Sequence, residues 1–92
     1  MTRTRASELA RKLRLPPARG MEAVIKAQLI DAVIKAAKRG RLTHAELARR
    51  SGLPRSAVTG ILSGSLQRVT VDRVLRLVDA ANLVAEIKVK AA

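Results

Sequence analysis

Two short predicted helices, Thr43–Arg50 and Pro54–Ser63, constrain the fold of this chain more than any other segment. The first helix has a capping box, because its threonine N-cap is followed three positions later by Glu46. Gly52 can adopt the positive φ that a sharp turn requires. A proline suits the first turn of the second helix, and Gly64 ends that helix. The segment therefore predicts two helices held at a fixed angle by a tight turn.

The longest predicted helix covers residues 21–39 and is closed by Gly40. Its apolar residues form two neighbouring stripes, of which the first contains Met21, Ile25, Leu29, Val33 and Ala36. The second stripe contains Ala23, Ala27, Ile30 and Ile34. One stripe is expected to pack on the domain, and the other either packs there too or serves a partner. The Glu22–Lys26 pair, acid before base at i,i+4, suits an exposed edge.

The last part of the chain changes its apolar period. A helix is predicted over about Val71–Ala81, with Thr70 as its cap. Residues 84–90 then alternate between apolar and charged side chains, which predicts a β-strand. One side of that strand carries Ala85, Ile87 and Val89. A lone strand leaves its backbone groups unpaired, so we expect it to pair with the same strand of a second copy across a two-fold axis.

Charge is distributed unevenly along the chain. Its 19 Lys and Arg residues against 7 Asp and Glu give a net charge of +12. Residues 1–20 hold six basic residues and one acid, and residues 41–68 hold five and one, whereas residues 69–92 are nearly balanced. The excess lies on an N-terminal arm, where a short helix is predicted over roughly Ser7–Leu13, and on the two short helices. A polyanion is the expected partner.

The motif also has a family resemblance. Residues 52–64 resemble the recognition segment of Xre-type (Cro/C1-like) helix-turn-helix proteins, and residues 42–48 resemble their first motif helix. Residues 70–80, with the strand after them, are similar to the subgroup that contains HigA-like antitoxins of type II toxin–antitoxin pairs. The resemblance covers about residues 22–90. It implies DNA binding and the fold of those repressors.

Length and composition agree with a small single domain. The chain has 92 residues and no Phe, Trp or Tyr, so its core must be aliphatic. The expected fold is all-α: a five-helix Cro/C1-repressor-like helix-turn-helix domain with a C-terminal β-strand at about 84–90. We expect a basic arm at residues 1–20 and a DNA-binding domain with its dimerisation strand at residues 21–92.

The resemblance implies a set of functional positions. Those expected to meet bases in the major groove are Arg55, Ser56, Thr59 and Gly60. Those expected to approach phosphates are Thr43, His44, Ser65, Gln67 and Arg68. Those expected to form the inner face of the motif are Leu47, Ala48, Leu53, Val58 and Ile61. The chain departs from the family at three positions: His44, where Gln is usual, Gly60, where a longer polar side chain is common, and Ser51, where an apolar residue is usual.

The same residues have suitable chemistry without the resemblance. Early positions of the second motif helix reach base edges. Arg55 is the only long donor there, and arginine favours guanine O6 and N7, although a phosphate contact is an equal alternative. Ser56 and Thr59 can donate, accept or touch a thymine methyl group. His44, the only histidine, is either a phosphate-facing donor or simply an exposed helix residue.

These features favour a sequence-specific double-stranded DNA-binding repressor that binds an inverted-repeat operator as a homodimer. The resemblance extends this to an antitoxin and autorepressor of a small ribonuclease toxin, with arm 1–20 and the second apolar stripe as candidate contacts. The alternative is a solitary or phage-derived Xre-type repressor without a toxin. RNA binding is a third hypothesis, and the lack of aromatic residues disfavours it.

Other classes lack the residues they need. Without cysteine there are no disulfides or thiolate metal sites, and one histidine with few acids suits neither a metal site nor a triad. No nucleophile–base pair, glycine-rich phosphate loop or carboxylate pair suggests an enzyme, so no cofactor is expected. No apolar run approaches the ~20 residues of a membrane span. A bacterial cytoplasmic, nucleoid-associated location is simpler than the organelle import that the Arg-rich start resembles.

Overall fold

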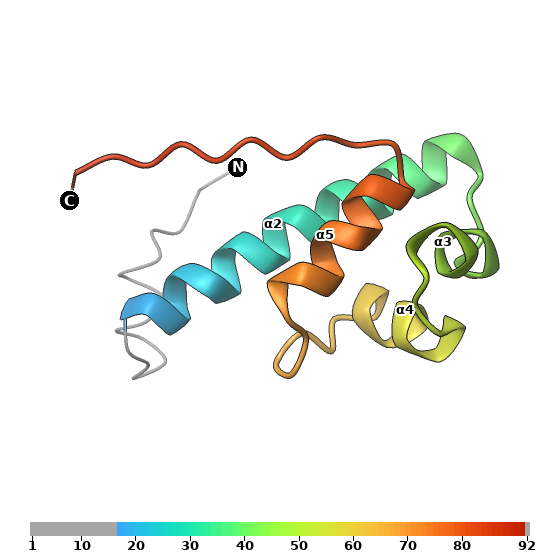
Figure 1. The fold of residues 1–92 in the computed structure, drawn as a ribbon, viewed down its shortest axis with the longest axis horizontal. Coiled ribbons are helices and arrows are strands. Elements are labelled where there is room, and N and C mark those ends of the chain that lie inside the picture. Colours follow the sequence, from blue (N-terminus) through green and yellow to red (C-terminus); the bar gives the residue numbers. More distant parts are fainter. Residues whose placement is uncertain (1–16, 92) are drawn as a thin grey trace.

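The computed structural model describes residues 17–91, and this part of the chain folds into four helices joined by short loops (Figure 1). The helices are α2 (Pro17–Gly40), α3 (His44–Ser51), α4 (Arg55–Leu62) and α5 (Val71–Ala80). The described part is therefore all-helical, as expected. The predicted helix over Ser7–Leu13, which would make a fifth, lies outside the described residues.

Both ends of α2 differ from the prediction. The helix begins at Pro17 rather than at residue 21, because proline has a helical φ and its missing N–H costs nothing in the first turn. Gly40 does not close the helix but is its last residue. Arg41 instead adopts the left-handed conformation, with φ 54°, and the N–H of Leu42 donates to the carbonyl of Ala37 at 2.9 Å.

The buried face of α2 combines the two predicted stripes. Ile30 from the second stripe and Val33 from the first are both buried, and Ala37 continues the line. Met21 and Ile25, expected in the same stripe as Val33, are 50% and 37% exposed. Leu29 and Ala36 of the first stripe and Ile34 of the second also pack against the core, so both stripes are covered in the second half of the helix.

α5 packs against both α2 and α3, and α3 packs against α4 (Figure 1). Thr70 caps α5 by accepting a hydrogen bond from the N–H of Arg73, as the sequence predicts, and the helix ends at Ala80 with Ala81 as its C-cap. All four helices contribute to one aliphatic core. Its completely buried large side chains are Leu47, Leu77, Val33, Val58 and Val74.

One charged side chain is buried with the core. Lys26 is only 5% exposed, although its pairing with Glu22 suggested an exposed edge. Its Nζ lies 2.6 Å from the Glu22 carboxylate and donates to the carbonyl of Leu66 at 3.5 Å. Burying a charge is costly unless it is paired, and both partners are present here. This contact holds the loop between α4 and α5 against α2.

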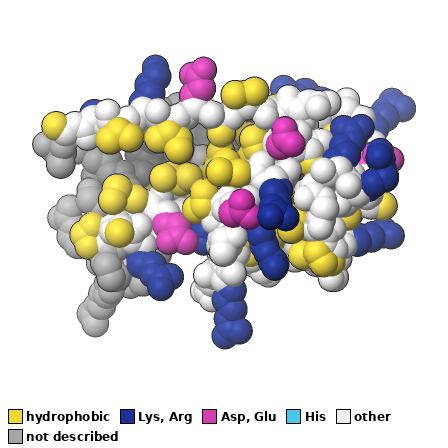
Figure 2. All heavy atoms as spheres, viewed as in Figure 1, with side chains coloured by type: hydrophobic (Ala, Val, Ile, Leu, Met, Phe, Trp, Pro, Cys, Tyr) yellow, Lys and Arg dark blue, Asp and Glu magenta, His cyan; other side chains and the backbone are white. Residues whose placement is uncertain are grey.

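After α5, the chain runs as an extended segment across the helices (Figure 1). The strand predicted at 84–90 is not found, since these residues make no backbone hydrogen bond with any other described residue. Ala85 packs against the core, whereas Ile87 and Val89 are 72% and 90% exposed. A strand needs a neighbouring strand to complete its ladder, and the described part of the chain contains none. Figure 2, in the same view as Figure 1, shows apolar side chains gathered on the face of the molecule turned to the reader.

Candidate nucleic-acid interface

The angle between α3 and α4 is set by local caps that the sequence predicts. Thr43 accepts a hydrogen bond from the N–H of Glu46 at 3.1 Å, and Gly52 takes φ 76° and donates its N–H to the carbonyl of Ala48. Ser51, polar where an apolar residue was expected, also stabilises the turn. Its hydroxyl donates to the Ala48 carbonyl and accepts from the N–H of Leu53 at 3.2 Å.

α4 has one buried face and one exposed face. Val58 and Ile61 are buried in the core, while the predicted base-contacting side chains Arg55, Ser56 and Thr59 are exposed. Gly60 is partly buried, and a Cβ placed on it would meet nothing within 4 Å. The exposed face of the helix therefore presents short polar side chains and one arginine, with open space at Gly60.

The first turn of α4 is open to a negatively charged partner. Its N-cap is Pro54, which has no side-chain acceptor, and its first turn contains no acid. The first backbone bond of the helix runs from the N–H of Val58 to the Pro54 carbonyl at 3.1 Å. The preceding N–H groups of the turn have no intrahelical partner and lie at the positive end of the helix dipole.

A side-chain hydrogen bond joins the two motif helices on this surface. Nδ1 of His44, the first residue of α3, lies 2.9 Å from Oγ1 of Thr59 in α4. The structure thus brings together a predicted phosphate contact and a predicted base contact. Sequence reasoning missed this pair, because it treated His44 and Thr59 as independent contacts.

The comparison with protein families agrees with this geometry. The family described as Helix-turn-helix domain matches residues 13–90. The chain belongs to this family. No curated protein and no solved structure gave a significant match. Membership supports a DNA-binding regulator.

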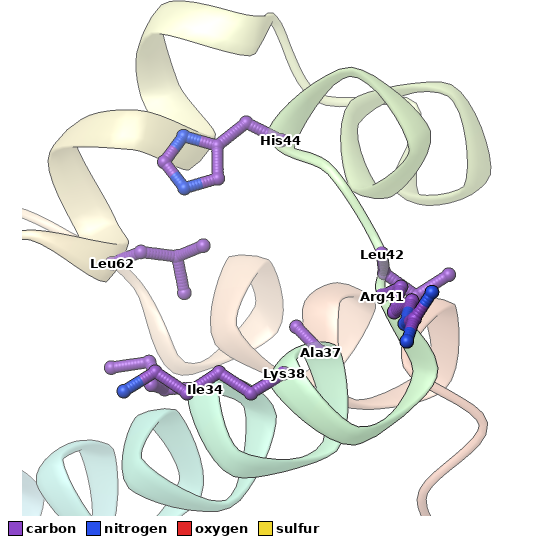
Figure 3. Close-up of a pocket in the computed structure, with 7 residues that line it drawn as sticks. All are labelled: Ile34, Ala37, Lys38, Arg41, Leu42, His44 and Leu62. Atoms are coloured by element: carbon purple, nitrogen blue, oxygen red, sulfur yellow. The ribbon is translucent and has the colours of Figure 1, made fainter.

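Two further cations of this helix-turn-helix protein lie beside the motif. Lys38 at the end of α2 and Arg41 in the following loop line an open pocket of about 410 Å³ together with His44 (Figure 3). The floor of the pocket is aliphatic, with Ile34 and Leu62 among its residues. Lys38 is in the last turn of α2, where a cation interacts favourably with the helix dipole, whereas no local pattern accounts for Arg41. Only the folded chain places both next to the start of α3.

Acidic charge near the motif is neutralised locally. Glu46, the one acid of residues 41–68, pairs with Arg49 at 2.7 Å and with Arg50 at 3.5 Å. The hydrogen bond from Arg49 holds the pKa of Glu46 below its ordinary value, so this carboxylate remains paired with arginine. Arg50 also donates to the carbonyl of Ala80 at 3.3 Å and so ties α3 to the end of α5.

The remaining predicted phosphate contacts are in the loop that follows α4. Ser65, Gln67 and Arg68 are exposed, and the loop turns at Gly64 with φ 99°. They lie apart in sequence from the pair His44–Thr59, and no hydrogen bond joins them to it. Within residues 17–91, no group of His, Asp and Glu is placed to hold a metal ion, and no helix has the length and apolarity to cross a membrane.

Proposed function

We propose that this protein is a sequence-specific double-stranded DNA-binding repressor. The observation that carries the proposal is the two-sided nature of α4, whose inner face is locked into the core by Val58 and Ile61 while Arg55, Ser56 and Thr59 face outward. Residues at the start of a recognition helix contact base edges. Arg55 would read guanine O6 and N7, and the short hydroxyl residues would read neighbouring bases. Gly60 would allow a close approach of the backbone.

Backbone contacts to DNA would surround this reading helix. We assign phosphate contacts to Thr43, His44, Ser65, Gln67 and Arg68, and we add Lys38 and Arg41 because they line the pocket beside His44. The hydroxyl of Thr43 accepts from Glu46 and still has its proton to donate. Such contacts fix the position of a protein on DNA and make its affinity depend on salt.

The repressor would act as a homodimer on an inverted-repeat operator. The exposed apolar side chains Ile87 and Val89 and the free backbone groups of residues 84–90 support an antiparallel strand pair with a second copy, in which Ala85 would also take part. The substitution Ile87→Lys should give monomers in sedimentation at concentrations where the wild type is dimeric. Ala91→Lys adds the same charge beyond the strand and should remain dimeric. Monomers of the wild type at every concentration would refute the dimer.

A gel shift on the promoter of its own gene tests DNA binding. We expect the promoter to be bound more tightly than random duplex at moderate salt, with an affinity that falls steeply as salt rises. Arg55→Ala should reduce promoter affinity roughly tenfold to a hundredfold, the range of a good base contact. Arg73→Ala removes the same charge from an exposed position of α5 and serves as the control. Equal affinity for promoter and random duplex would contradict the proposal.

A toxin-binding role is a second proposal, favoured by the exposure of Met21 and Ile25 near the start of α2. In this role the protein would be the antitoxin of a type II pair, and the neighbouring gene would encode a small ribonuclease. Co-expression of both genes with a tag on one should recover both proteins, and Ile25→Asp should weaken recovery. An isolated gene would favour the alternative, a solitary or phage-derived repressor.

A further inference from the structure

We propose that His44 is a specificity-determining positioning residue, which orients the Thr59 hydroxyl so that Thr59 presents an acceptor to the DNA base. This inference rests on the proposed DNA-binding function and deepens it. The observation is the 2.9 Å contact between His44 Nδ1 and Thr59 Oγ1, which joins the beginning of α3 to the exposed face of α4.

The chemistry of the two groups limits what Thr59 can offer. A threonine hydroxyl has one proton to donate, and a neutral imidazole has one N–H and one acceptor nitrogen. If Nδ1 accepts, the Thr59 proton points at His44, and its oxygen faces DNA only as an acceptor. If Nδ1 donates, the Thr59 proton is free for a base. The partner of the other imidazole nitrogen decides between these arrangements.

The surroundings of His44 favour the first arrangement. Its imidazole lies beside a pocket that also contains the cations Lys38 and Arg41, which would attract a DNA phosphate to this place (Figure 3). A phosphate only accepts hydrogen bonds, so it takes the Nε2–H of the imidazole, and in the neutral ring Nδ1 must then accept from Thr59. A chain of hydrogen bonds thus runs from Thr59 through His44 to the phosphate.

The consequence is a defined base preference. With its proton directed at His44, Thr59 can accept from the exocyclic amine of adenine N6 or cytosine N4 in the major groove, and it disfavours the acceptors of guanine. His44 would determine this preference although it touches no base itself.

Two substitutions separate the roles of the two ring nitrogens. The amide of His44→Asn lies near the position of Nδ1 and so keeps a partner for Thr59, but it lacks a group at Nε2. The amide of the longer His44→Gln lies near the position of Nε2, so it keeps a group for the phosphate but lacks a partner for Thr59 at the position of Nδ1. Each protein, and Thr59→Val, would be used to select duplexes from a library with randomised central base pairs. The position at which Thr59→Val loses the preference of the wild type is the one that Thr59 reads.

At that position we expect the wild type to prefer adenine or cytosine by about three- to tenfold, the range of one net hydrogen bond. His44→Gln should reduce this preference to the level of Thr59→Val, whereas His44→Asn should keep the preference while binding all sequences more weakly. Arg73→Ala on α5 should reproduce the wild-type selection. Adding Thr59→Val to His44→Gln should change the preference no further, because the two residues act as one unit.

A measurement without DNA tests the contact itself. His44 is the only histidine, so a long-range ¹H–¹⁵N spectrum of the imidazole gives one set of ring nitrogens. Thr59→Val should shift Nδ1 more than Nε2. The inference is overturned if Nδ1 does not respond, if Thr59→Val keeps the wild-type preference, or if His44→Gln keeps it. In these cases sequence selection by the wild type would still support the proposed function, whereas a wild type that selects no sequence would refute both.

Discussion

The ammonium group of Lys26 in α2 lies 3.5 Å from the carbonyl oxygen of Leu66, forty residues further along the chain. Glu22 neutralises that ammonium group from one turn away. The contact fastens the loop that carries Ser65, Gln67 and Arg68 to the longest helix. It is the one place in the described chain where a charged side chain is buried among core residues.

Replacing Lys26 with Met should destabilise the protein by about 1–3 kcal/mol, because the Leu66 carbonyl would lose its donor in a partly buried place. Urea unfolding measures this change. Lys35→Met is the matched control, since Lys35 pairs with Asp31 in the same helix at 2.9 Å but is 64% exposed. The control should cost at most about 0.5 kcal/mol. Equal losses for the two variants would show that the Leu66 contact contributes nothing.

Stability should fall in acid through Glu22 and Glu46. A hydrogen bond from Lys26 lowers the pKa of Glu22, and one from Arg49 lowers the pKa of Glu46, each from an ordinary value of 4.5. The unfolded chain therefore binds protons first, so this stabilisation is complete above pH 4.5 and is lost as the pH falls through the lowered folded pKa values. Urea unfolding across this range measures it. Glu22→Gln and Glu46→Gln should each reduce the loss of stability at acid pH.

Arg41 should be replaceable by glycine with a gain in stability. Its φ of 54° costs a residue with a Cβ about 1–2 kcal/mol, whereas glycine adopts this conformation freely. After the entropic cost of glycine, a net gain of roughly 0.5–1 kcal/mol is expected. Arg39→Gly, inside the last turn of α2, should instead lose about 1 kcal/mol. If Arg41→Gly is more stable than the wild type but binds DNA more weakly, the charge of Arg41 contributes to DNA binding at the expense of stability.

Gly52 and Gly60 should respond to alanine in opposite ways. Gly52 has φ 76°, so Gly52→Ala should destabilise the motif by about 1–2 kcal/mol. Gly60 lies in α4 with no atom near its missing Cβ, so Gly60→Ala should stabilise the protein by roughly 0.5–1 kcal/mol. Thermal unfolding measures both. A stable Gly60→Ala protein with normal DNA affinity would remove Gly60 from the base-contacting residues.

Local signals in the sequence predicted the motif well. The caps at Thr43, Gly52 and Thr70 depend only on neighbouring residues, and the structure confirms each of them. The family resemblance implied the inward face of α4 at Val58 and Ile61, and the structure buries both side chains. The family match over residues 13–90 confirms the helix-turn-helix assignment, but it does not reach the HigA-like subgroup.

Several features that the sequence did not predict depend on residues distant along the chain. The buried Lys26 donates to Leu66, forty residues away, and Thr59 forms a hydrogen bond with His44, fifteen residues away. The buried line of α2 depends on where α5 crosses it, which periodicity within one helix cannot specify. The strand at 84–90 remains a prediction for a dimer, because within one chain these residues form no backbone hydrogen bond with the other described residues.

If the proposed homodimer forms, the hydrogen bond from Arg50 to the Ala80 carbonyl bears on the spacing of its operator half-sites. It holds α3, which packs against α4, to the end of α5, where the C-terminal segment begins. In a symmetric dimer, the distance and the relative rotation between the two α4 helices would then vary little. Inserting one base pair between half-sites rotates them by about 34° around the duplex, so such a spacer should be rejected even when both half-sites are intact.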